Sequence, residues 1–142
     1  MIAIGLSGQL VYTLFEGSFN SKRCIEFFEL LLARVAGPIR LVLDRLQVHR
    51  SVETNAWLSD PAHPERRRLR ISLLPAYAPE LNPQELVNQH LKATLLVDGP
   101  PLDKRDYHSR WRDLLDDLQA EPDFVQQFFA AEEVAYIHHP RV

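Results

Sequence analysis

The chain has 142 residues, of which 46% are hydrophobic and 25% are charged, and its formal net charge is −3 at pH 7. This length and composition fit one globular domain with a hydrophobic core. The net charge excludes a protein that wraps nucleic acid over its whole surface, so any such contact must be local. No stretch is apolar for long enough to span a membrane, and the single cysteine, Cys24, cannot form an internal disulfide, which fits a reducing cytoplasm.

The first 36 residues predict a β-hairpin followed by an amphipathic helix. Two strand-like runs, residues 2–6 and 9–15, flank Ser7-Gly8, a two-residue hairpin signal. A helix is expected over about residues 21–36. Its apolar residues recur at helical spacing along one stripe: Cys24, Phe27, Phe28, Leu31 and Val35. We therefore interpret Cys24 as a core residue.

A short, mostly apolar run at residues 39–43 ends in a carboxylate, Asp44. Gly37-Pro38 should end the preceding helix, and the run itself predicts a strand that is buried on both faces. In open α/β sheets the functional groups lie just past the carboxyl ends of such strands, so Asp44 is our first catalytic candidate. An aspartate that opens a surface turn explains this segment equally well.

Two polar features follow Asp44 along the chain. His49 is either a residue beside the carboxylate, facing metal or DNA, or a histidine that packs at the start of the next helix, which is the interpretation we favour. That helix should begin after Ser51, a suitable N-cap. Arg66, Arg67 and Arg68, with Arg70, form a dense basic patch, which is either a solvated loop or a phosphate contact.

A proline-rich loop leads from a strand at residues 69–74 into a helix whose first turn carries Glu85. Asn82 is a suitable N-cap, Pro83 occupies the first helical position and Glu85 the third, a pattern close to a capping box. An acid at this position stabilises a helix through the cap and the helix dipole. The alternative is a metal ligand held at the start of a rigid helix. Lys92 lies two turns further on the same face and could meet a phosphate.

The remaining residues predict a helical region after the break at Gly99-Pro100-Pro101. Two amphipathic stripes, which we interpret as core or interface, comprise Tyr107, Trp111, Leu114, Leu115 and Leu118, then Phe124, Val125, Phe128 and Phe129. The adjacent His138 and His139 are not expected to form a metal pair, because neighbouring residues on an extended chain point apart.

Several of these segments together resemble the catalytic domain of DDE transposases, most closely the mariner-type superfamily and related bacterial insertion-sequence transposases. They are L-V-L-D at residues 41–44, His49, L-L-P-A-Y-A-P-E-L-N-P-Q-E at residues 73–85, and Leu91-Lys92. The resemblance implies an α/β fold of the RNase H-like, integrase type, a mixed sheet with flanking helices. It implies that residues 1–98 form the catalytic domain and residues 99–142 a C-terminal helical extension of it.

The resemblance also implies metal-dependent phosphoryl transfer on DNA. In the family three acids hold two Mg²⁺ or Mn²⁺ ions that clamp the scissile phosphate, and carboxylates suit such hard cations. By resemblance Asp44 matches the second acid and Glu85 the third, so both are expected to be catalytic and to bind metal. Lys92 matches a basic position expected to face DNA, with Arg66, Arg67 and Arg68 as further candidates for DNA binding.

The sequence also departs from the family pattern. The family's first aspartate lies on a central strand that precedes the opening hairpin, so we expect an N-terminally truncated domain that lacks this strand and its acid. Arg45 stands where the family often has Asn, and Asn88 where it often has Trp. We expect a transposase fragment that is inactive as an isolated chain, with DNA at transposon ends, itself or a full-length transposase as partners, and no membrane. The alternative is a non-enzymatic fragment that binds a full-length transposase or DNA.

Overall fold

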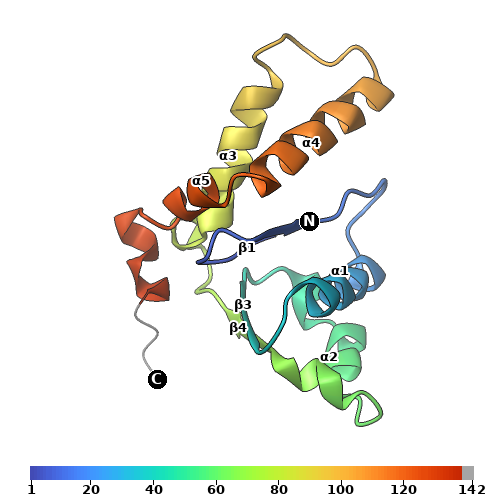
Figure 1. Ribbon diagram of the computed structural model, residues 1–142. Helices are drawn as coiled ribbons and strands as arrows, with labels where there is room; N and C mark the ends of the chain where they lie inside the picture. Colours follow the sequence, from blue (N-terminus) through green and yellow to red (C-terminus); the bar gives the residue numbers. More distant parts are fainter. Residues whose placement is uncertain (139–142) are drawn as a thin grey trace. The chain divides into compact units, whose positions relative to one another are not determined.

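The computed structural model describes residues 1–138, and within them the chain forms two compact units. One unit is continuous, Phe15–Ala78, and the other combines Met1–Leu14 with the chain from Pro79 onward. Each unit contains a two-stranded sheet and several helices (Figure 1). The chain is therefore a mixed α/β protein, as the sequence predicts.

The unit of residues 15–78 alternates helices and strands. It contains α1 (Ser21–Arg34), β3 (Ile39–Leu43), α2 (Val52–Ser59) and β4 (Leu69–Leu73), with short 3₁₀ segments η1 (Gln47–Arg50) and η2 (Pro64–Arg68). Asn20 caps α1 by accepting a hydrogen bond from the Arg23 backbone N–H, and Ser51 caps α2, as predicted. The predicted α1 stripe is buried at Cys24, Phe27, Phe28 and Leu31, whereas Val35 is half-buried just beyond the helix end.

The strands β3 and β4 form a parallel pair, with Ile39 opposite Leu69 and Leu43 opposite Leu73. The ladder extends one residue further, because the Leu74 backbone N–H donates to the Leu43 carbonyl at 2.8 Å. The bounds of β3 agree with the sequence, but its expected burial on both faces is wrong: Arg40 is exposed and the other four residues are half-buried. Among the described residues each strand has only one neighbour, so one edge of each is unpaired.

The second unit begins with a hairpin of β1 (Ile2–Ile4) and β2 (Leu10–Tyr12). Its loop is one residue longer than predicted. The Gly8 N–H donates to the Gly5 carbonyl and the Gly5 N–H to the Gln9 carbonyl, which is a turn followed by a left-handed residue. Gly8 takes that conformation with φ of 83°, and a Cβ on it would lie 2.1 Å from the Pro122 carbonyl oxygen.

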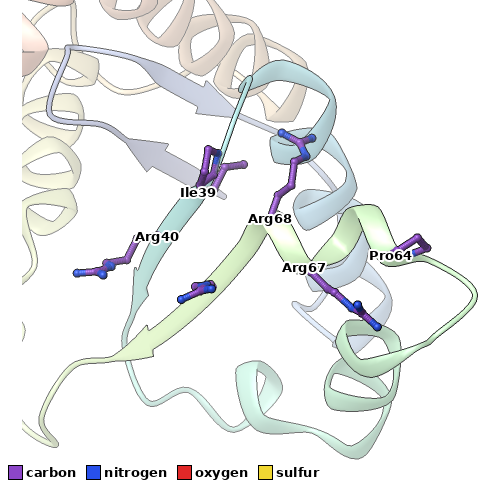
Figure 2. A pocket seen from close by; sticks show the side chains of 7 residues that line it. Ile39, Arg40, Pro64, Arg67 and Arg68 are labelled. Atoms are coloured by element: carbon purple, nitrogen blue, oxygen red, sulfur yellow. The ribbon is translucent and has the colours of Figure 1, made fainter. Parts of the chain in front are cut away.

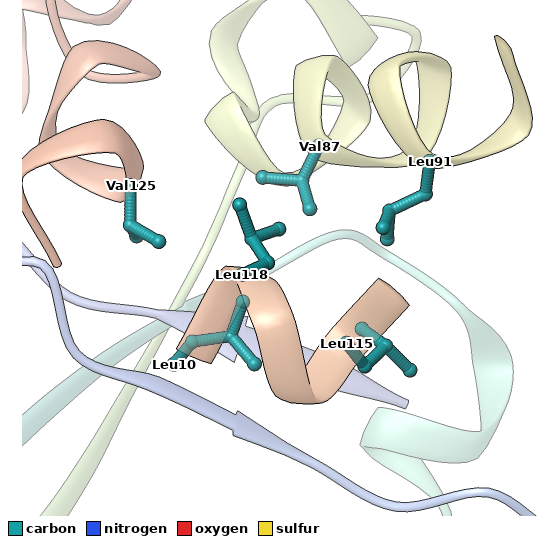
Figure 3. Close-up of a cluster of buried hydrophobic side chains, with 6 residues drawn as sticks. All are labelled: Leu10, Val87, Leu91, Leu115, Leu118 and Val125. Carbon is teal, nitrogen blue, oxygen red and sulfur yellow. The ribbon is translucent and has the colours of Figure 1, made fainter. Parts of the chain in front are cut away.

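The hairpin shares a hydrophobic core with the helices of the same unit, α3 (Pro83–Leu95), α4 (Lys104–Gln119) and α5 (Pro122–Gln127). Figure 3 shows the six buried side chains of this cluster: Leu10, Val87, Leu91, Leu115, Leu118 and Val125. Two polar contacts also join β2 to α4, since the Gln119 side chain donates to the Leu10 carbonyl at 2.6 Å and the Tyr12 hydroxyl donates to Asp116.

Most residues of the C-terminal stripes contribute to this core, as predicted, whereas Tyr107 is 43% exposed and Phe129 is buried but is not part of this cluster. A 3₁₀ segment, η4 (Glu132–Ile137), follows α5, and a second, η3 (Pro79–Leu81), precedes α3. His138 lies with Nε2 3.0 Å from the Phe129 carbonyl oxygen, and His139 is outside the described residues. Over residues 1–138, no helix combines the length and the apolar character needed to cross a membrane.

Candidate functional site

Asp44 directly follows β3, at the carboxyl end of the strand, as the sequence predicts. Its Oδ1 accepts a hydrogen bond from the Leu46 backbone N–H at 3.1 Å, and the same oxygen lies 3.0 Å from Nδ1 of His49. The contact with Leu46 is the short local turn that aspartate favours. Within the described chain Oδ2 has no hydrogen bond, and the side chain is 47% exposed. Asp44 therefore opens a turn and at the same time keeps one oxygen available for a ligand.

His49 lies buried beside Asp44, with 7% of its surface exposed. Its Nδ1 is 3.2 Å from the Asp44 carbonyl oxygen as well as 3.0 Å from Oδ1, and its ring meets the Phe19 ring edge-on at 5.7 Å. Because both neighbours of Nδ1 are acceptors, we assign the ring proton to Nδ1. The buried Nε2 finds no hydrogen-bond partner among residues 1–138. His49 therefore packs, as we favoured from the sequence, and it also fixes the orientation of the carboxylate.

Arg45 joins the ends of the two parallel strands on the side where Asp44 lies. Its Nε donates to the carbonyl of Leu74, just past β4, at 2.9 Å. This contact and the Leu74–Leu43 hydrogen bond hold the carboxyl ends of β3 and β4 together. The sequence marks Arg45 only as a departure from a family pattern, because a contact 29 residues away leaves no local signal.

Glu85 lies in the first turn of α3, but the predicted capping box does not form. The Asn82 side chain accepts from the Gln84 N–H at 3.1 Å, and the Asn82 N–H donates to the Pro79 carbonyl at 2.9 Å. Since η3 already satisfies the Asn82 N–H that the box would use, the Glu85 carboxylate is not needed there. Across the described residues this half-buried carboxylate makes no hydrogen bond or ion pair.

Arg68, one of the predicted DNA contacts, is engaged within its own unit. Its guanidinium donates to the carbonyls of Leu32, Val35 and Gly37 at 2.6, 3.1 and 2.8 Å. These carbonyls belong to the last turn of α1 and to the residues just beyond it, where helical carbonyls lack partners. Arg68 therefore serves as a side-chain cap for the C-terminus of α1.

The other predicted DNA contacts differ in their surroundings. Arg66 donates to the Trp57 carbonyl at 2.9 Å, and its guanidinium carbon lies 4.2 Å from the centroid of the Trp57 ring. It also lies 3.5 Å from Asp60 Oδ2. Arg67 and Lys92 are both exposed, without a hydrogen bond or ion pair to any described residue.

Each of the two predicted metal ligands has at least one carboxylate oxygen that accepts no hydrogen bond from a described residue. Such oxygens are hard donors that can bind a cation. Asp44 belongs to the unit of residues 15–78 and Glu85 to the other unit. Within residues 1–138, no group of three or more His, Cys, Asp or Glu side chains is gathered closely enough to hold a metal ion. Mg²⁺ is often bound through only one or two carboxylates, while water and substrate phosphates complete its shell. Each of the two carboxylates, taken by itself, is a ligand of the type that such a cation takes.

Comparisons with known proteins agree with the motif in the sequence. The family model described as DDE superfamily endonuclease matches residues 1–106, a span that includes Asp44, Glu85 and Lys92. Searches of curated proteins and of solved structures found no match. Because the match covers 106 of the 142 residues, the chain belongs to the DDE superfamily of endonucleases.

Proposed function

We propose that this chain is a transposase-type DDE domain and that Asp44 and Glu85 take part in metal-dependent phosphoryl transfer on DNA. The observation that carries this proposal is the hydrogen bonding of the Asp44 carboxylate. One carboxylate oxygen is held by Leu46 and His49, while the other has no hydrogen bond within the described chain. A carboxylate fixed in this way is pre-organised for a ligand, as is common around metal sites.

A bound divalent cation, Mg²⁺ or Mn²⁺, would neutralise developing charge on the scissile phosphate. Asp44, through its free oxygen, and Glu85 would each serve as a ligand to such a cation. His49 and the Leu46 N–H keep the Asp44 carboxylate from rotating, and the Asn82 cap keeps the first turn of α3 in place beneath Glu85. Lys92 and Arg67, exposed and without a described partner, are the proposed DNA contacts among the residues that the sequence singles out, while Arg66 and Arg68 already donate within the chain.

We further propose that the sheet of β3 and β4 belongs to an RNase H-like, integrase-type fold in which β3 pairs with one more central strand. The unpaired edge and half-burial of β3 support this proposal, because parallel strands are normally covered on both faces. In the family this strand carries the first aspartate. It would come from a longer form of the chain or from another molecule.

By resemblance, Asp44 and Glu85 stand for two of the family's three acids, so we propose that residues 1–142 do not cleave DNA on their own. Phosphoryl transfer by two metals requires ions roughly 4 Å apart. Metal-dependent cleavage by the purified chain, abolished by Asp44→Ala, would overturn this part of the proposal.

Binding of Mn²⁺ tests the assignment of the two acids directly. We expect Asp44→Asn and Glu85→Gln each to weaken Mn²⁺ binding, measured from the EPR signal of the free ion. The matched controls are Asp98→Asn and Glu29→Gln, which remove the same charge from exposed acids without a described partner. If all four variants bind Mn²⁺ as the wild type does, Asp44 and Glu85 are not its ligands.

Adding the missing strand tests the fold and the chemistry together. A strand fused upstream or supplied as a peptide should raise the melting temperature, because it pairs the free edge of β3. It should restore metal-dependent nicking only when it carries its aspartate. An unchanged melting temperature with every such strand would contradict the proposed sheet.

A second candidate function is a non-enzymatic fragment that binds a full-length transposase, and the free edge of β3 is the observation that favours it. Unpaired strand edges accept strands from other chains, with backbone hydrogen bonds providing the affinity. Under this alternative the chain would bind the full-length protein equally well with Asp44→Asn and Glu85→Gln, and the strand fusion would not restore nicking.

A further inference from the structure

Two arginines stand side by side on the β3–β4 sheet, near the amino ends of the strands. Arg40 and Arg70 are direct neighbours in the parallel register, and both are exposed. Adjacent strands lie about 4.8 Å apart, so the two side chains leave the sheet from one small area. Like charges placed directly opposite each other destabilise a sheet. This arrangement therefore requires either a compensating anion or a stability cost.

The two arginines line a pocket together with Pro38, Ile39, Pro64, Arg67 and Arg68 (Figure 2). Arg68 donates hydrogen bonds to the end of α1, whereas Arg67 projects from η2. In the part of the chain that the structure describes, Arg40, Arg67 and Arg70 make no hydrogen bond or ion pair to another residue. The positive charge of the pocket is thus not neutralised within that part of the chain.

We propose that this pocket binds the phosphodiester backbone of DNA through Arg40 and Arg70, with Arg67 as a further lining residue. The planar guanidinium group matches phosphate oxygens with two parallel hydrogen bonds. The net charge of the chain is −3. Three unpartnered arginines around one pocket therefore make this pocket positively charged on a chain that is negative overall. That the phosphates belong to DNA rests on the proposed function, whereas the anion site rests on the arginines themselves.

The pocket is separate from Asp44 within the same unit. Arg40 precedes Asp44 by four residues along an extended strand, which places their Cα atoms roughly 13 Å apart at about 3.3 Å per residue. A phosphate in the pocket is therefore not the phosphate that would be cut at Asp44. The site would hold flanking DNA and should act without any metal ion.

The test is the salt dependence of DNA binding, measured by fluorescence anisotropy of a labelled duplex in buffer with EDTA. Each phosphate contact contributes about 0.9 to the slope of log K against log salt. We expect the double variant Arg40→Gln/Arg70→Gln to bind more weakly and to lower the slope by about 2. The control is Arg105→Gln/Arg112→Gln, which removes the same charge from exposed positions on α4 and should keep the wild-type slope. Equal slopes for the two double variants would overturn the proposal.

Two further measurements separate the possible causes of a change. Removing the like-charged pair should leave the melting temperature unchanged or raise it, so weaker DNA binding accompanied by a lower melting temperature would count against a direct contact. Titration with inorganic phosphate separates a small-anion site from a DNA site. If phosphate binds through Arg40 and Arg70 while DNA affinity is the same in both double variants, the DNA backbone is not the ligand.

The metal-site variants keep this result distinct from the proposed function. In EDTA, Arg40→Gln/Arg70→Gln should lower the salt slope by about 2 whether or not it is combined with Asp44→Asn and Glu85→Gln, because the two arginines bind phosphate without a metal ion. If Asp44→Asn and Glu85→Gln bind Mn²⁺ as the wild type does, the two acids are not metal ligands, and the arginine site is unaffected by that result. If the two double arginine variants have equal salt slopes, the arginine site is wrong, and the assignment of Asp44 and Glu85 as metal ligands is unaffected.

Discussion

At the scale of single residues, the contact between His49 and Asp44 leads to the first prediction. The substitution His49→Phe keeps a ring against Phe19, removes the hydrogen bonds to Asp44 and eliminates the unpartnered Nε2. We expect the melting temperature to change little, because an unsatisfied buried polar atom is itself costly. Mn²⁺ affinity should fall by about 10-fold, the lower end for groups that orient metal ligands. The control is His90→Phe against Phe124, which should leave Mn²⁺ binding unchanged.

Glu85 gives a second prediction, since its carboxylate is not part of a capping box. Glu85→Gln and Glu85→Ala should therefore be similarly stable in urea unfolding, each losing only about 0.3–1 kcal/mol of interaction with the helix dipole. Asn82→Ala removes the actual cap and should cost about 1 kcal/mol. A Glu85→Ala variant that is clearly less stable than Glu85→Gln would show that the carboxylate does take part in capping.

Cys24 gives a third prediction, which concerns alkaline pH. Burial raises the pKa of its thiol to about 11, against a weaker opposing effect of a hydrogen bond with Thr54. Because the folded pKa lies above the unfolded value, the unfolded state loses its proton first, and stability should fall as pH rises from about 9 to 11. Urea unfolding at pH 8 and pH 10.5 measures this change. In Cys24→Ala, the part of this fall in stability that is due to ionisation of the thiol should be absent.

At the scale of secondary-structure elements, the Arg68 side chain stabilises the end of α1. Arg68→Met retains the aliphatic stem and removes three hydrogen bonds to carbonyls, so we expect a loss of roughly 2 kcal/mol in urea unfolding. Arg67→Met, one residue away and exposed, should change stability by less than about 0.5 kcal/mol. Equal effects of the two substitutions would contradict the capping role of Arg68.

The elements that the sequence predicts well are those specified by nearby residues. The limits of β3 follow from Gly37-Pro38 before it and Asp44 after it, the start of α2 follows from Ser51, and α1 follows from its apolar stripe. The capping box fails because it depends on how the preceding chain runs: η3 supplies the Pro79 carbonyl to the Asn82 N–H. The expected burial of β3 fails for a similar reason. The pattern of apolar residues indicates that a strand is apolar, but it does not indicate which element covers that strand.

The residues of the candidate site are likewise predictable only where nearby residues determine their positions. Asp44 and Glu85 can be found from a motif, and their positions after β3 and at the start of α3 follow from local patterns. Three consecutive arginines, by contrast, look alike in a sequence, although Arg68 faces a helix end more than 30 residues away and Arg67 faces solvent. The pairing of Arg40 with Arg70 depends on strand register, which no local pattern fixes.

At the scale of the whole molecule, Gly8 links distant parts of one unit and gives a fifth prediction. Gly8→Ala would place a methyl group against the Pro122 backbone at a positive φ, whereas Gly17→Ala, with φ of 88°, meets no atom within 4 Å. The left-handed conformation alone costs about 1–2 kcal/mol, so both variants should be destabilised in urea. Gly8→Ala should lose more, and equal losses would indicate that the hairpin loop is not held against Pro122.

The split composition of this unit also has a consequence for synthesis on the ribosome. The β1–β2 hairpin precedes α4 by about 100 residues, yet its Leu10 side chain belongs to the same buried cluster as Leu115 and Leu118 of α4. At about 5–20 residues per second, the hairpin waits roughly 5–20 s for those residues to be translated. The continuous unit of residues 15–78 is complete well before then. The nascent chain therefore carries an apolar hairpin without its α4 partner while the intervening residues are translated, and in this interval the hairpin is exposed to chaperones and to aggregation.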